Sequence, residues 1–182
     1  MWYLLRKEEN WNAEATGIDE SVSGVIVADN GQEILILSYA SICEDAKEWC
    51  VTFSDKSEYK ASLKKKDKNS GFAIFAVDKK SLSDATWSAS SVASLGNSNL
   101  TEQGDVIFAL GNIFGYAGGS GYGIVSSSNY KEIGRDGEYS VIATDMSSAS
   151  EGTGILFNLD GEVIGMISSD IWKDRGVRTA NA

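Results

Sequence analysis

The chain has 182 residues, of which 42% are hydrophobic, which is enough for one sizeable globular core or for two small barrels. It carries 26 acidic and 16 basic residues, so its formal net charge is −10. Such an acidic chain argues against nucleic acid as a partner, because phosphate binding needs clustered lysine and arginine. No stretch reaches the roughly 18 apolar residues of a membrane-spanning helix, so we expect no membrane span in this chain.

Histidine, the commonest general base at neutral pH, is absent from the chain. This absence excludes a Ser-His-Asp or Cys-His mechanism built from this chain alone. The two cysteines, Cys43 and Cys50, do not suffice for a metal site without histidine, and we expect neither a metal nor another cofactor. The pair could close a short disulfide loop in an oxidising compartment or remain as two free thiols. The sequence leaves these two alternatives open.

Apolar, β-branched segments separated by polar turns fill the first half of the chain. Residues 2–5 are expected as a strand or a docking arm within an N-terminal arm, residues 1–22. Residues 23–28 and 33–38 predict a hairpin around Asp29-Asn30-Gly31. Three further strands are expected, at residues 49–53, 58–63 and 71–77. The lysine run at residues 64–66 is interpreted as a solvated loop.

The second half begins with a change in composition. Residues 78–99 are rich in Ser, Ala, Asp and Lys, which is typical of a linker. The β pattern returns at residues 106–110, and the glycine-rich stretch 111–123 is interpreted as a crowded loop. It lacks the Gly-Lys-Ser/Thr sequence of a phosphate-binding loop. Strands are expected at 124–127 and 139–144, with a polar turn at 129–138 between them.

The stretch 150–168 reads SEGTGILFNLDGEVIGMIS and predicts a hairpin. It begins with a tight turn, Glu151-Gly152-Thr153-Gly154. Two apolar strands follow, at 155–157 and 162–168, joined by a turn at Asp160-Gly161. In total, about a dozen short strands recur roughly every 8–12 residues, a spacing that predicts an all-β barrel or sandwich.

From about residue 23 to residue 168 the chain resembles the protease domain of the HtrA/DegP family of trypsin-like proteases. The likeness rests on these segments, in collinear order: SGVIVADNGQEILILS, VTFSDKSEYKASL, GFAIFAV, ASLGNSNLTEQGDVIFALGNIFG, GYGIVSS, ATD and NLDGEVIGM. The resemblance implies two six-stranded antiparallel β-barrels in a single trypsin-like domain at residues 23–182. Barrel one would cover about residues 23–80, a linker about 81–99, and barrel two about 100–170.

The family's catalytic triad is degenerate in this chain. Tyr39 stands where the family has its histidine, and Gly71 stands where it has its aspartate. Alignment back from NLDGEVIG places Gly152 on the nucleophilic serine, whereas a one-residue deletion places Thr153 there, and both alternatives stay open. Tyrosine is a poor base because its ordinary pKa is about 10. The resemblance therefore implies a catalytically inactive homologue, a pseudoprotease.

An intact strand framework without a triad suggests a binding or scaffold module for a peptide or protein ligand. The residues expected at its binding cleft are Tyr39, Glu151, Gly152, Thr153 and Gly154, together with the loop at 168–178. The alternative is a residual or noncanonical serine/threonine-type endopeptidase that uses Thr153. The resemblance further implies an extracytoplasmic location, at the cell surface or secreted. A membrane tether outside this chain and homo-oligomerisation are further alternatives.

Overall fold

The computed structural model of the chain describes residues 2–8, 21–44, 46, 48–67, 69–133, 137–149 and 152–167. Strands dominate these residues, and the α-helix among them has only five residues, so the expected all-β class is confirmed. The chain divides into two compact units, residues 1–93 and 94–182. No helix among the described residues is long and apolar enough to cross a membrane.

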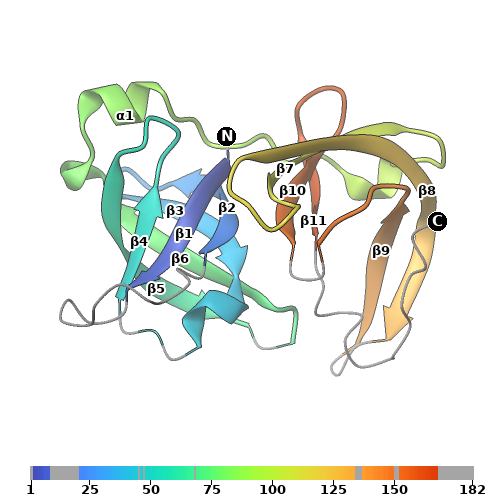
Figure 1. Ribbon diagram of the computed structural model, residues 1–182, viewed down its shortest axis with the longest axis horizontal. Coiled ribbons are helices and arrows are strands. Elements are labelled where there is room, and N and C mark those ends of the chain that lie inside the picture. The colour runs from blue at the N-terminus through green and yellow to red at the C-terminus, as the bar shows by residue number, and fades with distance from the viewer. Residues whose placement is uncertain are drawn as a thin grey trace. The chain divides into compact units, whose positions relative to one another are not determined.

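The first unit contains a closed barrel of six antiparallel strands (Figure 1). Its order around the barrel is β1-β2-β3-β6-β5-β4. The strands are β1 (Trp2–Glu8), β2 (Ser21–Asp29), β3 (Glu33–Tyr39), β4 (Glu48–Thr52), β5 (Glu58–Lys66) and β6 (Phe72–Asp78). The barrel closes through β1, which pairs with β2 on one side and with β4 on the other. Residues 2–5, which were expected to form a strand or a docking arm, therefore form part of a strand.

Alternating burial along the strands builds the interior of this barrel. Ile34 and Ile36 of β3 are fully buried, and so is Phe75 of β6. Successive side chains of a strand point to opposite faces, so a period of two places every second residue inside the barrel. Each such side chain contributes roughly 1.5–3 kcal/mol on burial. The apolar pattern of the sequence is thus the direct cause of the barrel.

The lysine run at residues 64–66 forms the end of strand β5, so the expectation of a solvated loop was wrong. One of its exposed charges has an ion-pair partner, because Lys64 Nζ lies 2.8 Å from a carboxylate oxygen of Glu33 in β3. Earlier in the same strand, Lys60 pairs with Glu48 of β4. Cross-strand pairs of opposite charge favour a strand, which explains why a charged sequence is extended here.

A polar network anchors the segment that follows the barrel. The short helix α1 (Asp84–Ser88) begins after Ser83, whose hydroxyl caps it by accepting from the Thr86 N–H at 3.1 Å. Thr86 is fully buried, and its hydroxyl donates to Asp55 Oδ2 at 2.6 Å. The same hydroxyl lies 3.0 Å from the Tyr59 hydroxyl. This helix is therefore fastened to the turn between β4 and β5.

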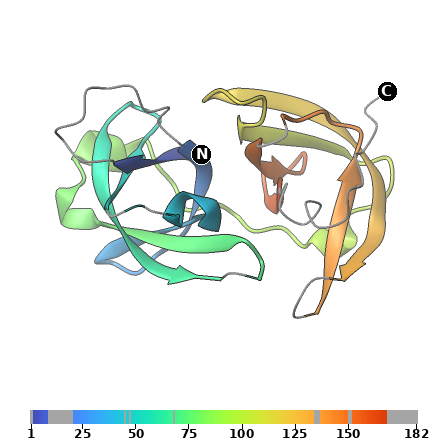
Figure 2. The ribbon, with the colours of Figure 1, turned by 60° about the horizontal axis from the view of Figure 1, so that its bottom comes forward.

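The second unit is a five-stranded antiparallel sheet in the order β11-β10-β7-β8-β9. Its strands are β7 (Val106–Asn112), β8 (Gly119–Ile133), β9 (Glu138–Thr144), β10 (Thr153–Phe157) and β11 (Val163–Ile167). Figures 1 and 2 show β8 as the long, arched strand of this unit. Within the described residues the sheet thus has one strand fewer than the expected six.

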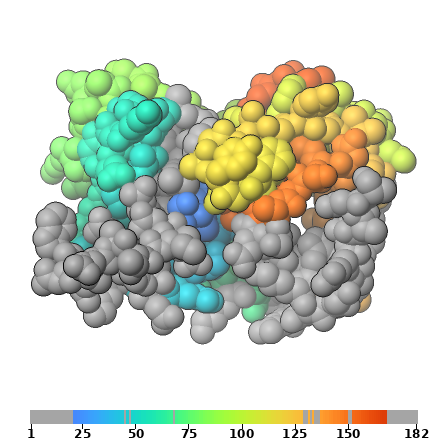
Figure 3. Space-filling view, viewed as in Figure 1, coloured from blue at the N-terminus to red at the C-terminus, as the bar shows by residue number. Residues whose placement is uncertain are grey.

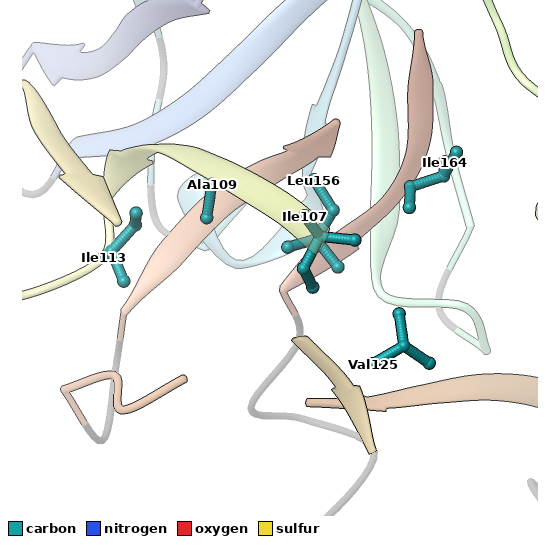
Figure 4. Close-up of a cluster of buried hydrophobic side chains, with 6 residues drawn as sticks. All are labelled: Ile107, Ala109, Ile113, Val125, Leu156 and Ile164. Carbon is teal, nitrogen blue, oxygen red and sulfur yellow. The ribbon is translucent and has the colours of Figure 1, made fainter. Parts of the chain in front are cut away.

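Side chains from four strands and one loop form the core of the second unit (Figure 4). The buried cluster consists of Ile107, Ala109, Ile113, Val125, Leu156 and Ile164. Three partly buried residues pack against it: Ile142, Met146 and Ile167. The hairpin β10–β11 contributes two of the buried residues, so the stretch that the sequence marks most clearly also supplies part of this core.

Two expectations for the second unit were wrong, both because β8 is longer than predicted. It runs for 15 residues through Gly119–Ile133, which includes much of the expected glycine-rich loop and the first part of the expected turn at 129–138. Glycine is needed in this strand because neighbouring atoms approach closely. A Cβ at Gly119 would lie 3.1 Å from the Gly111 carbonyl oxygen, and one at Gly123 would overlap with Asp145 Oδ1.

The network around Thr86 leads to a prediction about stability. We expect Thr86→Val to lower the free energy of unfolding by about 1–3 kcal/mol, because it removes a buried hydroxyl and leaves its partners unpaired. Chemical denaturation measures this change. Ser88→Ala is the matched control, because Ser88 is exposed on the same helix, and it should stay within about 0.5 kcal/mol of wild type. Equal stability of the two variants would contradict the prediction.

The same network makes the difference in stability between wild type and Thr86→Val depend on pH. The Thr86 hydroxyl and then the Ser57 N–H hold the pKa of Asp55 below its ordinary value of 3.8. Because the folded pKa is lowered, ionised Asp55 stabilises the fold above pH 3.8, and this contribution is lost as the pH falls through the lowered pKa. Wild type and Thr86→Val should therefore differ more in unfolding free energy near pH 7 than near about pH 2.

Candidate functional site

The first unit brings together two of the three expected triad positions. Tyr39 is the last residue of β3 and pairs in register with Phe72, the first residue of β6. Gly71 directly precedes Phe72, and its carbonyl oxygen accepts a hydrogen bond from the Ala40 N–H at 2.8 Å. The backbones at the positions of the family's histidine and aspartate are therefore neighbours, as the resemblance implies.

Neither of these positions presents a reactive group. The Tyr39 side chain is only 4% exposed, and its ring packs edge-on against Phe72 with 5.8 Å between ring centroids. Gly71 has a φ of +74°, in the left-handed region that glycine adopts readily and other residues adopt at a cost of about 1–2 kcal/mol. Aspartate tolerates this region better than most residues other than glycine, so an aspartate at this position would strain the backbone less than most side chains would.

In the second unit, main-chain atoms occupy the space beside Gly152. The Ile113 carbonyl oxygen accepts the Ala149 N–H at 2.9 Å, and the Ala149 carbonyl oxygen accepts the Gly152 N–H at 2.9 Å. A Cβ at Gly152 would overlap with the Ile113 oxygen and come within 3.1 Å of the Ala149 oxygen. Because these are backbone atoms held by hydrogen bonds, no side chain fits at position 152 without a shift of the main chain.

Thr153 and Gly154 belong to strand β10 and not to the tight turn that the sequence predicted. Thr153 pairs in register with Asn112 of β7, and its side chain is 8% exposed. Gly154 pairs with Gly111, and a Cβ on it would lie 3.0 Å from the Ile113 side chain. Glu151 and the loop at 168–178 lie outside the described residues.

A cavity that the sequence did not reveal lies within the second unit. It has a volume of about 250 Å³ and is lined by Ile113 and Phe114 after β7, by Gly121 and Tyr122 of β8, and by Asp145, Met146 and Ser147 after β9. In Figure 3 the yellow residues of the β7–β8 connection lie beside the orange residues that follow β9. Two features of the sequence could have indicated this cavity. One is an aspartate directly after an apolar strand, and the other is the presence of aromatic residues in a glycine-rich stretch.

The two cysteines are both free thiols, Cys50 buried and Cys43 half-buried. Burial raises the pKa of the Cys43 thiol, which lowers the fraction of reactive thiolate at neutral pH. Within the described ranges no group of three or more His, Cys, Asp or Glu side chains is placed to hold a metal ion.

Comparison with known proteins identifies one family. The sequence profile described as trypsin-like peptidase domain matches residues 22–166. Two curated relatives, from Pseudomonas savastanoi pv. phaseolicola and Halomonas elongata, are both named probable periplasmic serine endoprotease DegP-like. Each is 34% identical over 155 residues, which make up 85% of this chain and 30% of the relative. The chain therefore spans less than a third of the length of these relatives.

A solved structure shows the same fold. An HtrA-type protease solved with a tripeptide superposes with a TM-score of 0.67 at 23% sequence identity. The superposition covers 91% of this chain and 49% of that one. The expected trypsin-like fold is thus confirmed, with the difference in strand count given above.

The close approach at Gly152 predicts a marked sensitivity to substitution. We expect Gly152→Ala to lower the free energy of unfolding by about 1–3 kcal/mol, because the added methyl group overpacks a site bounded by backbone. Gly137→Ala is the matched control, since nothing lies within 4 Å of a Cβ there, and it should change stability by less than about 0.5 kcal/mol. Thermal or chemical unfolding measures both, and a neutral Gly152→Ala would show that position 152 has room for a side chain.

Proposed function

This chain belongs to the trypsin-like peptidase domain family, and we propose that it is a catalytically inactive member that binds peptide or protein segments. Its likeness within the family is to serine proteases of the HtrA/DegP group. The relatives' names describe periplasmic endoproteases. We propose that this chain shares the extracytoplasmic location of these relatives but lacks their proteolytic activity.

The observation that carries the proposal is the packing at Gly152. Direct alignment of the β10–β11 hairpin puts Gly152 on the family's nucleophile, and the Ile113 carbonyl oxygen fills the space that a serine side chain would need. A serine protease requires a hydroxyl beside a base and an oxyanion hole formed by nearby backbone N–H groups. At position 152 the nearest groups are instead carbonyl oxygens, which repel a developing oxyanion.

The first unit supports the same proposal independently. The chain has no histidine, and the tyrosine in its place is buried against Phe72. Gly71 has no side chain to orient or charge-stabilise a base. Three positions in two units thus lack the required chemistry, and two of them have a backbone adapted to glycine.

The enzymatic alternative would use Thr153 as nucleophile. A threonine hydroxyl needs an adjacent base to become nucleophilic at neutral pH. Thr153 is instead 8% exposed within a paired strand, and a substrate carbonyl would have to reach it there. The observed burial therefore favours the inactive, ligand-binding function over a threonine-type endopeptidase.

The proposed inactivity predicts that restoring the triad residues does not restore catalysis. We expect the variant Tyr39→His, Gly71→Asp, Gly152→Ser to remain inactive, because a side chain at position 152 would overlap with the Ile113 carbonyl oxygen. Cleavage of β-casein and labelling by a fluorophosphonate probe measure this, with trypsin as positive control. Wild-type labelling that disappears in Thr153→Ala would instead establish the threonine-type enzyme.

The proposed binding function predicts that the chain captures an unstructured polypeptide without cutting it. Fluorescein-labelled, dephosphorylated β-casein should show a saturable rise in fluorescence anisotropy at micromolar concentrations of the chain, about the range of transient interactions. Gel electrophoresis of the same samples should show intact casein. Absence of binding up to about 100-fold higher concentration would contradict the proposal.

A further inference from the structure

An apolar patch lies on the outer face of strands β7 and β8. Val106 pairs in register with Ile124, and Phe108 pairs with Tyr122, so these four side chains share one face of the sheet. Three side chains that alternate with them point the other way, into the buried cluster: Ile107, Ala109 and Val125. We call the four outward-facing residues the β7–β8 patch.

The β7–β8 patch faces solvent although it is apolar. Tyr122 is 79% exposed, and Val106, Phe108 and Ile124 are 38–44% exposed. An aromatic side chain can bury about 150–250 Å², so Phe108 and Tyr122 together leave about 180–300 Å² open to a partner. With Val106 and Ile124 added, the patch reaches the roughly 300–600 Å² that is typical of the largest, and often functional, apolar patch on a soluble protein.

The patch continues an apolar row that begins on the neighbouring strand. Phe157 of β10 pairs in register with Phe108, so both side chains lie on the same face, and Phe157 is only 8% exposed. Exposure therefore rises across the row from Phe157 through Phe108 to Tyr122. Neighbouring strands lie about 4.8 Å apart, and alternate residues of a strand lie about 7 Å apart. The patch thus has room for two or three apolar side chains of a bound segment.

Two acidic turns border this end of the sheet. One leads into β7 and carries Glu102 and Asp105, and the other joins β10 to β11 and carries Asp160 and Glu162. Because β7 and β10 pair antiparallel, the start of one strand lies beside the end of the other, so both turns lie at the same end. Within residues 94–126 and 153–167 these four are the charged residues, and none is basic.

The lysine on β8 does not neutralise this border. Lys131 follows Ile124 by seven residues, which corresponds to roughly 20 Å along a strand. Its ammonium group pairs with Glu138 of β9. The apolar patch is therefore combined with a border of one charge sign, and this charge decides which partner fits.

From the β7–β8 patch and its acidic border, we infer that this face docks a polypeptide segment whose apolar side chains are flanked by lysine or arginine. The inference rests on the binding function proposed above and gives it a surface and a partner class. Burial of the apolar area supplies affinity, and the border attracts and orients the basic flanks. A second copy of this chain, with its net charge of −10, is a poor occupant, because two acidic borders repel each other.

The test titrates the full ¹⁵N-labelled chain with three capped peptides: KKLWLKK, its acidic analogue EELWLEE and its analogue without apolar anchors, KKSGSKK. We expect KKLWLKK to bind with a dissociation constant of about 10–300 μM, as weak contacts do. The amide resonances of residues 106–108 and 122–124 should shift. Each analogue should bind at least about tenfold more weakly, because one meets charge of its own sign and the other buries no apolar area.

Two pairs of variants assign the binding to this face. Tyr122→Thr removes an exposed ring while keeping a residue that suits a strand, and it should weaken KKLWLKK about five- to tenfold. Tyr116→Thr is its control, because Tyr116 is 61% exposed but lies in the connection between β7 and β8. Asp105→Asn keeps an oxygen for the Glu102 N–H and should weaken KKLWLKK about two- to fivefold. Asp84→Asn, at an exposed position of the first unit, is its control, and both controls should leave the affinity unchanged.

Equal affinity for KKLWLKK and EELWLEE, equal effects of a variant and its control, or shifts that map away from the two strands would overturn the inference. Shifts of the same amides when the chain is concentrated without peptide would also overturn it, because a second copy would then occupy the face. Casein binding and gel electrophoresis on the same samples separate the two proposals. If casein binds and stays intact while KKLWLKK fails, only the assignment of this face falls; if KKLWLKK binds the patch while casein is cleaved, only the inactive function falls.

Discussion

The second unit depends most on the contacts of the Ile113 carbonyl oxygen. This oxygen accepts the Ala149 N–H and lies against Gly152, while the Ile113 side chain is part of the buried cluster of the sheet. The same residue therefore holds the segment between β9 and β10 against the core. Because β10 begins one residue later, at Thr153, the main chain at Gly152 is fixed by packing.

Each unit has one position that favours glycine, but the physical reason differs between the two units. In the first unit the constraint is conformational, since Gly71 has a positive φ that other residues tolerate poorly. In the second unit the constraint is steric, since the atoms beside Gly152 are backbone. At positions 71 and 152 the backbone favours glycine, so these two residues contribute to the stability of the fold.

Much of the fold could be predicted from local patterns. The short apolar runs of β3 and β6 and the Asp160-Gly161 turn each specify a strand or a hairpin through nearest neighbours alone. The extent of β8 could not, because glycines at 119 and 123 have low strand propensity and are explained only by atoms distant in sequence, including those of Gly111 and Asp145. The extended structure of the lysine run in β5 was missed for a related reason, since the partner of Lys64, Glu33, lies on another strand distant in sequence.

The candidate site could likewise be predicted only in part from the sequence. The residues at positions 39 and 71 were readable from collinear motifs, whereas the sequence left Gly152 and Thr153 as alternatives for the third position. The start of β10, where Thr153 pairs with Asn112, could not be predicted from the local sequence. The cavity beside Asp145 required three segments to converge, so no single motif could reveal it. Since the hydrogen bond to Ile124 holds the carboxylate and Gly123 leaves room for it, the local backbone of β8 is shaped around Asp145.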